Sequence, residues 1–194
     1  MKVLIAIDSS AGSAKVLEEV AARPWPEGTI FSVAHVIDLQ RFAKLPALVE
    51  DARREGDRIV KAGVETLSRS RYKAFPEVLV GFPRRAVSEY AKEWNADLIL
   101  VGSHGHSAIG RFLLGGVAQG VLRTAPCSVE IVRRQAGALA SAPPMKILLA
   151  TDGSDCSVGA VHSVAKGLWP AGAIIKVLSV EELMVFDNQM TASS

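Results

Sequence analysis

The sequence predicts a doubly wound α/β fold, a five-stranded parallel sheet with helices on both faces. Three observations carry this prediction. Short aliphatic runs alternate with longer amphipathic segments over the first two thirds of the chain, as repeated βαβ units do. The aliphatic runs are continuous, as in strands covered on both faces. The 194 residues are 49% hydrophobic and 22% charged, a composition that excludes a disordered chain.

The first strand and the helix after it are marked by their composition. Val3–Ile7 is a run of aliphatic and β-branched residues of strand length. Ser9 or Ser10 follows this run, and either side chain suits the N-cap of a helix. The apolar side chains of that helix recur every three to four residues. Pro24 and Pro26 then end it.

The remaining elements continue the alternation. Thr29–Val36 is expected to be the second strand. The charged stretch from about Leu39 to Ser70 carries apolar residues at helical spacing, as an amphipathic helix does. After it we expect a third strand at Glu77–Val80, a helix at Arg84–Trp94, a fourth strand at Leu98–Val101, a helix at Gly115–Arg123 and a last strand at Val129–Val132.

The chain repeats its own opening 144 positions later. Lys2–Asp8 (KVLIAID) aligns with Lys146–Asp152 (KILLATD), and the match continues without a gap through a second Trp-Pro pair. We therefore expect a complete domain at 1–134, a linker rich in small residues and proline at 135–144, and a partial second copy at 145–194 with a strand, a helix and a strand. Because about 50 residues rarely bury a sufficient core, the partial copy is expected to pack on the first domain or on another chain.

Composition and charge exclude several classes of protein. A net charge of +2 gives no reason to expect nucleic acid or an anionic membrane as partner. No apolar run approaches the roughly 20 residues of a membrane span, and the opening residues are no signal sequence, so we expect a cytoplasmic protein. Cys127 and Cys156 make no disulfide framework. Neither a metal cluster nor a nucleophile supported by a base is recognisable, so no metal site and no catalytic residue are expected.

The segment after the fourth strand predicts an anion site. Residues 101–117 read VGSHGHSAIGRFLLGGV, a buried strand followed by a glycine-rich loop and a glycine pair that opens a helix. Glycines let the backbone approach a ligand, and the first amides of a helix have no partner within it, so a phosphate is favoured there. The spacing is neither that of a Walker A loop nor that of a nicotinamide-binding loop.

The position of this loop also predicts where a ligand binds. In doubly wound sheets, ligands bind beyond the carboxyl ends of the strands, where the strand order reverses. If the order is 3-2-1-4-5, which we assume here, Asp8, Val36 and Gly102 surround one crevice.

The glycines at 102, 105 and 115 are spaced as G-x2-G-x9-G, which resembles the nucleotide-binding signature of the universal stress protein family. An aspartate ending the first strand and His35–Asp38 ending the second also resemble that family, and the likeness covers the first domain. The resemblance implies a three-layer fold of the adenine-nucleotide α-hydrolase type. It also implies a stress-response or regulatory role and binding of ATP, or of ADP or AMP, with any Mg²⁺ carried by the nucleotide.

The resemblance implies a role for individual residues. Asp8 would contact the adenine or ribose, Val36 would line the adenine slot, and Gly102 would face the ribose. Main-chain amides of the loop and of the following helix would bind the phosphates, and Arg111 is either a charged donor to them or an exposed surface residue. The complete expected set is Ala6, Asp8, Val36, Val101, Gly102, His104, Gly105, Arg111, Gly115, Gly116, Val117 and Ala118.

Two departures from the family signature leave an alternative open. Gly116 stands where the signature has Ser or Thr, and Ala118 also lacks a hydroxyl. A missing hydrogen bond to a charged group costs about 1.5–3 kcal/mol. The alternative is a family member that binds no nucleotide and acts as a dimeric interaction module. Asp8 has a second interpretation too, as a cap of the following helix.

Two further expectations concern turnover and association. Because no general base or nucleophile is positioned for chemistry, any ATP hydrolysis is expected to be slow. A homodimer is expected through the last strand, Ser128–Arg133, whose open edge needs covering, or through the partial copy.

Overall fold

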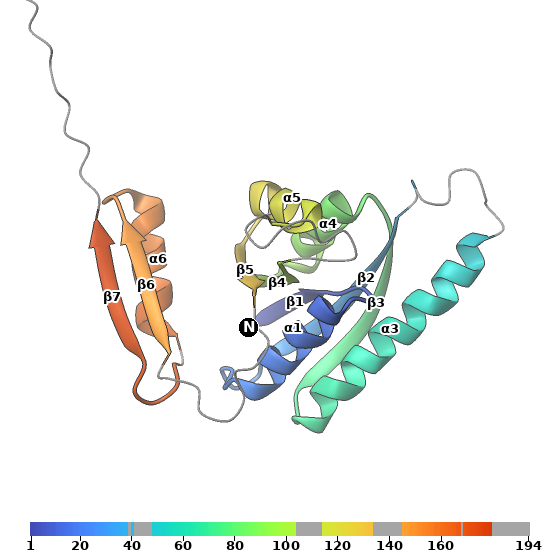
Figure 1. Cartoon of the computed structure of the whole chain (residues 1–194), viewed down its shortest axis with the longest axis horizontal. Coiled ribbons are helices and arrows are strands. Elements are labelled where there is room, and N and C mark those ends of the chain that lie inside the picture. The colour runs from blue at the N-terminus through green and yellow to red at the C-terminus, as the bar shows by residue number, and fades with distance from the viewer. Residues whose placement is uncertain (39, 41–47, 104–113, 134–144, 168, 180–194) are drawn as a thin grey trace, which may run out of the picture. The chain divides into compact units, whose positions relative to one another are not determined.

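The computed structural model describes residues 1–38, 40, 48–103, 114–133, 145–167 and 169–179. The chain divides into two compact units, Met1–Gly137 and Ala138–Ser194. Each is described by itself below, and Figure 1 labels their helices and strands. No helix in the described ranges has both the length and the apolar character needed to cross a membrane.

The first unit is a five-stranded parallel sheet in the order β3-β2-β1-β4-β5. Helices α1 and α3 lie on one face of the sheet and α4 and α5 on the other (Figure 1). This confirms the predicted fold class and the assumed strand order. The elements are β1 Lys2–Ala6, α1 Ala11–Ala22, β2 Ile30–Asp38, α3 Val49–Arg69, β3 Lys73–Gly81, α4 Pro83–Trp94, β4 Leu98–Gly102, α5 Gly116–Thr124 and β5 Ser128–Val132.

The central strand β1 divides its side chains between two hydrophobic clusters. Val3 and Ile5 point towards α1 and α3, and Leu4 points towards α4 and α5, because successive side chains of a strand lie on opposite faces. All three are fully buried. Burying one such side chain stabilises a fold by about 1.5–3 kcal/mol, so these clusters hold the carboxyl edge of the sheet in place.

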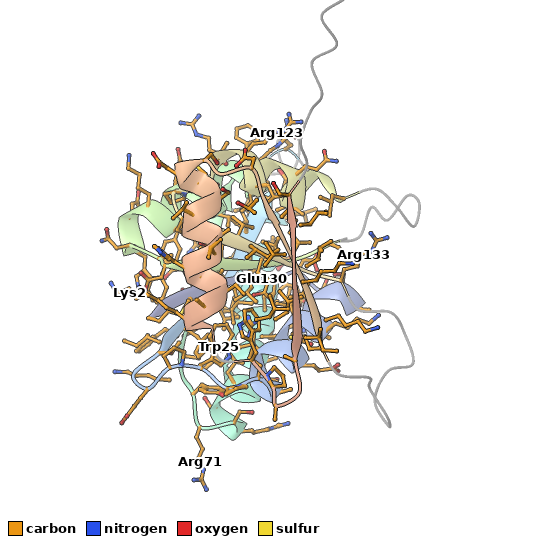
Figure 2. All side chains as sticks on the ribbon, turned by 90° about the vertical axis from the view of Figure 1, so that its left-hand side faces the viewer. Lys2, Trp25, Arg71, Arg123, Glu130 and Arg133 are labelled. Atoms are coloured by element: carbon orange, nitrogen blue, oxygen red, sulfur yellow. The ribbon has the colours of Figure 1, made fainter. Side chains whose placement is uncertain are left out.

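The end of α1 is tied to the edge strand β5 by one arginine. Arg23 donates a hydrogen bond from Nη2 to Glu130 Oε2 at 2.7 Å, and its guanidinium lies 4.2 Å from the centre of the Trp25 ring. Figure 2 labels Trp25 and Glu130. The Trp25 indole in turn donates to the carbonyl of Val20 at 2.9 Å and packs edge-on against Phe31. The turn between α1 and β2 is therefore anchored to the core.

Strand β3 is longer than the sequence predicts. The expected strand was Glu77–Val80, whereas β3 runs from Lys73 to Gly81 and pairs with β2 along its whole length. Pro76 lies inside it, which is tolerated because β3 is an edge strand and that residue need not donate on both sides. The long helix after β2 is described from Val49; residues 39 and 41–47, which were also expected in it, lie outside the described ranges.

The described part of the second unit contains a strand, a helix and a strand: β6 Lys146–Thr151, α6 Asp155–Lys166 and β7 Ile174–Ser179. Strands β6 and β7 are parallel, and Lys146 pairs with Ile174. Lys2 pairs with Ile30 in the first unit, so the register is the same after a displacement of 144 residues. The indole of Trp169 also donates to the carbonyl of Val164 at 2.7 Å, as Trp25 does to Val20.

Candidate functional site

The predicted site residues that the structure describes meet at the carboxyl edge of the first sheet. The strand order reverses between β1 and β4, which is where doubly wound sheets bind ligands. Ala6 pairs with Ala34 of β2 on one side and with Val101 of β4 on the other. Gly102 ends β4, and Val36 lies two residues beyond Ala34. These residues therefore lie beside one another at the switch point.

Asp8 is held at this edge by two serines of the β1–α1 turn. Its Oδ1 accepts hydrogen bonds from the Ser10 main-chain amide at 2.9 Å, from the Ser13 hydroxyl at 2.7 Å and from the Ser10 hydroxyl. The main-chain amide of Asp8 donates to Ser13 Oγ at 2.7 Å. The carboxylate thus holds Ser10, the N-cap residue of α1, and Ser13 in the first turn of that helix. The same contacts give it a fixed position beside the crevice.

The base of the glycine-rich loop is closed by one main-chain hydrogen bond. Gly115 N donates to Ser103 O at 2.8 Å, and Ser103 N donates to Val132 O at 3.0 Å. Ser103 is buried, so both ends of the loop are tied to strands β4 and β5. The amide of Gly115 is consequently used inside the protein, although it had been expected to face the phosphates.

Three consecutive main-chain amides at the start of α5 remain available to a ligand. The first hydrogen bond of this helix runs from Gln119 N to Gly115 O. The amides of Gly116, Val117 and Ala118 precede it and form no hydrogen bond among the described residues. They lie at the positive end of the helix dipole, where an anion is stabilised. This end of α5 therefore offers three main-chain donors to an anion at the switch point.

The side chains around these amides differ in exposure. Gly116 is exposed, and a Cβ placed there would have no neighbour within 4 Å. Val117 is exposed as well. The side chain of Ala118 is 2% exposed and packs into the cluster under α4 and α5. Ala118 can therefore contribute only its amide, and a hydroxyl at 118 would point into the core.

A hollow adjoins the other end of the site. It has a volume of about 360 Å³ and lies between α1 and α3, next to Asp8 and the serines that hold it. Its opposite wall is formed by Ile59, Gly63 and Thr66. A second hollow of about 420 Å³ lies between α4 and α5 and is lined by Arg84, Ser88, Lys92 and Thr124 among others. Only the first hollow includes a predicted site residue, Asp8, so the first hollow is the better candidate for ligand binding.

The expected site residues His104, Gly105 and Arg111 lie outside the described ranges. Sequence reasoning did not anticipate what Ser13 and Ser103 do at the site. A signal for Ser13 exists, because the repeat carries a serine at the same distance from its aspartate: Asp152 is followed by Ser154 and Ser157. Elsewhere in the first unit, burial raises the pKa of the Cys127 thiol, and Asp97 adds to the shift, as suits a packed side chain.

The chain is similar to curated universal stress proteins. The model of the universal stress protein family matches residues 1–133. Universal stress protein MJ0531 of Methanocaldococcus jannaschii is 32% identical over 106 residues, which cover 52% of this chain and 62% of that protein. Universal stress protein Sll1388 of Synechocystis is 28% identical over 149 residues, covering 68% of this chain and 97% of that protein. The match therefore spans somewhat less than two thirds of the first relative.

Solved structures show the same fold. A universal stress protein from Archaeoglobus fulgidus superposes with a TM-score of 0.70 and 22% identity, covering 98% of this chain and 68% of that one. A universal stress protein in complex with cAMP superposes with a TM-score of 0.52 and 23% identity over 68% of this chain and 95% of its own. A universal stress protein from Archaeoglobus fulgidus in complex with dAMP superposes with a TM-score of 0.53 and 21% identity, covering 69% of this chain and 98% of that one. At these identities the likeness concerns the fold.

Proposed function

The chain belongs to the universal stress protein family, and on that premise we propose that its first unit reversibly binds an adenine nucleotide. The phosphates bind at the N-terminus of α5 and the base lies towards Asp8 and Val36. ATP is the expected ligand, with ADP and AMP as shorter alternatives. The bound state serves a regulatory or stress-response role in the cytoplasm.

One observation carries the proposal. Three successive amides, those of Gly116, Val117 and Ala118, lack partners among the described residues at the switch point of the sheet. Amides fixed by a helix lose no further freedom when they bind, and the helix dipole adds to their attraction for an anion. They fit a phosphate group, because a phosphate offers several acceptor oxygens to neighbouring donors.

Residues on the opposite side of the crevice from α5 support binding of the adenine base. Val36 is half-buried beside the cluster under α4 and α5 and offers an apolar surface to a base. Asp8 offers a carboxylate whose position two serines hold. Relatives of the same fold were solved with cAMP and dAMP, and both ligands combine an adenine with a phosphate. This combination agrees with an apolar slot at one end and amides at the other.

We expect little catalysis. Among the described residues no group of three His, Cys, Asp or Glu side chains is placed to hold a metal ion, so any Mg²⁺ would arrive with the nucleotide. It would supply charge neutralisation of the phosphates. The residues of this chain would bind and orient the nucleotide, and hydrolysis would be slow.

Calorimetric titration of the full chain with ATP, ADP and AMP tests this function. Binding heat with a single site per chain is expected, and adenosine should bind more weakly than AMP because it lacks the phosphate. Absence of heat with all three nucleotides at millimolar concentration would refute the proposal.

The second candidate is a family member that binds no nucleotide and acts as a dimeric interaction module. It is favoured by Gly116 and by the buried side chain of Ala118, because neither position offers a hydroxyl to a phosphate. The absorbance ratio at 260 and 280 nm of the supernatant after denaturing the purified protein separates the two candidates. A nucleotide spectrum favours the first and its absence the second.

For both candidates we also propose a second unit that is a partial copy of the first, and a homodimer through the last strand of the first unit, Ser128–Arg133, or through the partial copy. Strand β5 pairs only with β4 among the described strands, and open edges invite pairing. Light scattering should give the mass of two chains; the mass of one chain would contradict the homodimer.

A further inference from the structure

The hollow of about 420 Å³ between α4 and α5 has no part in the proposed nucleotide site. The two helices cover the same face of the first sheet (Figure 1). Thr124 at the end of α5 and Pro126 after it form one side of the lining. The residues of α4 that form the other side lie one or three positions apart, so they make one stripe along that helix: Arg84, Arg85, Ser88, Glu89 and Lys92. The hollow therefore follows α4 for about two turns.

The two helices run in the same direction and meet closely along this hollow. A Cβ at Gly120 would come within 2.4 Å of the Arg84 Cβ, so α5 lies against α4 at this point. Four residues later on both helices, the hydroxyls of Ser88 and Thr124 are 2.7 Å apart. A further four residues along α4, Lys92 lies past the last residue of α5. Arg84 and Lys92 therefore lie towards opposite ends of the hollow, about 12 Å apart along the helix axis, with the hydroxyl pair between them.

The lining carries an excess of positive charge. Arg85 donates from Nε to Glu89 Oε1 at 2.7 Å, so these two charges compensate each other. Glu89 is the only carboxylate among the described lining residues, and the neighbouring Glu93 is exposed and lies outside the lining. Arg84 and Lys92 are exposed and form no ion pair with any residue that the structure describes. Both ends of the hollow therefore attract negative charge.

The middle of the hollow offers acceptors for hydrogen bonds. The Ser88 hydroxyl lies 3.2 Å from the carbonyl oxygen of Arg84, and the Thr124 hydroxyl lies 3.0 Å from that of Gly120. Both hydroxyl protons therefore have acceptors within the protein, which leaves lone pairs of the hydroxyl oxygens for a ligand. Thr124 is also the last residue of α5, at the negative end of the helix dipole. An N–H donor suits this position better than a carboxylate or a phosphate.

We propose that this hollow binds an acidic segment of a partner protein in an extended conformation. One carboxylate of the segment pairs with Arg84, a second pairs with Lys92, and a main-chain N–H between them donates to the hydroxyl pair. Residues four apart in an extended chain are separated by about 13 Å, which matches the separation of the two cations along α4. The acceptors in the middle disfavour a nucleic acid strand, whose phosphates would lie against them. The proposal is independent of nucleotide binding.

Short acetylated and amidated peptides test this surface on the full chain. The peptide EAVAE has two carboxylates four residues apart, EEAVA has the same composition with its carboxylates adjacent, and QAVAQ has the length and spacing without the charge. Amide signals of α4 and α5 are followed by NMR at low ionic strength. EAVAE should shift the signals of Ser88, Lys92 and Thr124 and should bind more tightly than the other two peptides. Inorganic phosphate is titrated in parallel as a free anion.

Variants of the two cations identify the contacts. Arg84→Gln and Lys92→Gln should each weaken binding of EAVAE about two- to fivefold, as expected for the loss of one exposed ion pair. Lys61→Gln is the matched control, because it removes one exposed positive charge from α3 on the other face of the sheet. The proposal would be overturned if no peptide bound, if EEAVA, QAVAQ or phosphate bound as tightly as EAVAE, or if Lys61→Gln weakened binding as much as the other two variants.

Discussion

The amide of Gly115 donates a 2.8 Å hydrogen bond to the carbonyl of Ser103. This contact joins the residue after β4 to the residue that caps α5, so the two ends of the glycine-rich loop are fixed. It also removes one amide from the set available to an anion. The candidate phosphate site therefore consists of three helix amides, those of Gly116, Val117 and Ala118.

Adding a hydroxyl at the start of α5 should strengthen nucleotide binding. A Cβ at Gly116 meets nothing within 4 Å, so Gly116→Ser should fit without strain and place a donor beside the phosphates. A hydrogen bond to a charged group is worth about 1.5–3 kcal/mol, which corresponds to roughly a tenfold to hundredfold lower Kd for ATP. Gly116→Ala is the matched control, because it improves helix propensity without a hydroxyl. Equal Kd values for the Ser and Ala variants in calorimetry would contradict the site.

A negative charge at position 116 should abolish ATP binding without lowering the stability of the protein. In Gly116→Asp the carboxylate lies in the first turn of α5, where the helix dipole stabilises it by about 0.3–1 kcal/mol. We therefore expect an unchanged or slightly higher Tm together with loss of measurable ATP binding, because the carboxylate repels the phosphates. Gly116→Asn, similar in size and uncharged, should retain more affinity. Undiminished ATP affinity in the Asp variant would show that the phosphates bind elsewhere.

The Ser13 hydroxyl should matter more for stability than an ordinary helix serine. Ser13 is buried, donates to Asp8 Oδ1 and accepts from the Asp8 amide. Ser13→Ala removes the acceptor of the Asp8 amide and one of the three hydrogen bonds to Asp8 Oδ1, at a cost of about 1–3 kcal/mol. Ser68→Ala on the exposed surface of α3 is the control and should change little. Urea denaturation followed through amide signals of β1 measures the difference; equal midpoints would contradict the role given to Ser13.

An acid titration should show that the serines after Asp152 stabilise its charged carboxylate. Hydrogen bonds from the Ser154 side chain and amide, and from Ser157, lower the pKa of Asp152 from 3.8 to about 2. The charged form therefore stabilises the start of α6 above pH 4, and this contribution is lost as the pH falls through 2. Carbon NMR of the Asp152 carboxyl should give a midpoint near 2, and Ser154→Ala should raise it. A midpoint at the ordinary value in the unaltered chain would contradict these contacts.

Sequence periodicity predicted the parallel sheet, whereas its strand order, and with it the switch point, was assumed within the limits that general rules set. Continuous aliphatic runs such as Val3–Ile7 require cover on both faces, and parallel strands joined by helices leave few topologies. The assumed order therefore placed Asp8, Val36 and Gly102 at one edge, where the structure describes them. The predicted length of β3 was wrong. A proline such as Pro76 normally interrupts a ladder of hydrogen bonds, but it is tolerated in β3 because this strand lies at the edge of the sheet.

The details of the candidate site were less accessible to sequence reasoning. Whether the Gly115 amide faces a ligand or the carbonyl of Ser103 depends on the path of the chain between strands, which spacing does not encode. Likewise, Ala118 belongs to the core because α5 packs on α4 with that side inward. The partners of Asp8 were recoverable only by comparing both copies, since the serines two and five residues later recur after Asp152.

Amide NMR of the full chain during addition of ATP measures the central claim most directly. The signals of Gly116, Val117 and Ala118 should shift downfield on saturation, as amides do when they donate to phosphate oxygens, while the signal of Gly115 should change far less. Adenosine should leave the three signals near their starting positions. Shifts confined to other parts of the chain, or equal effects of adenosine and ATP on these three amides, would contradict a phosphate site at the start of α5.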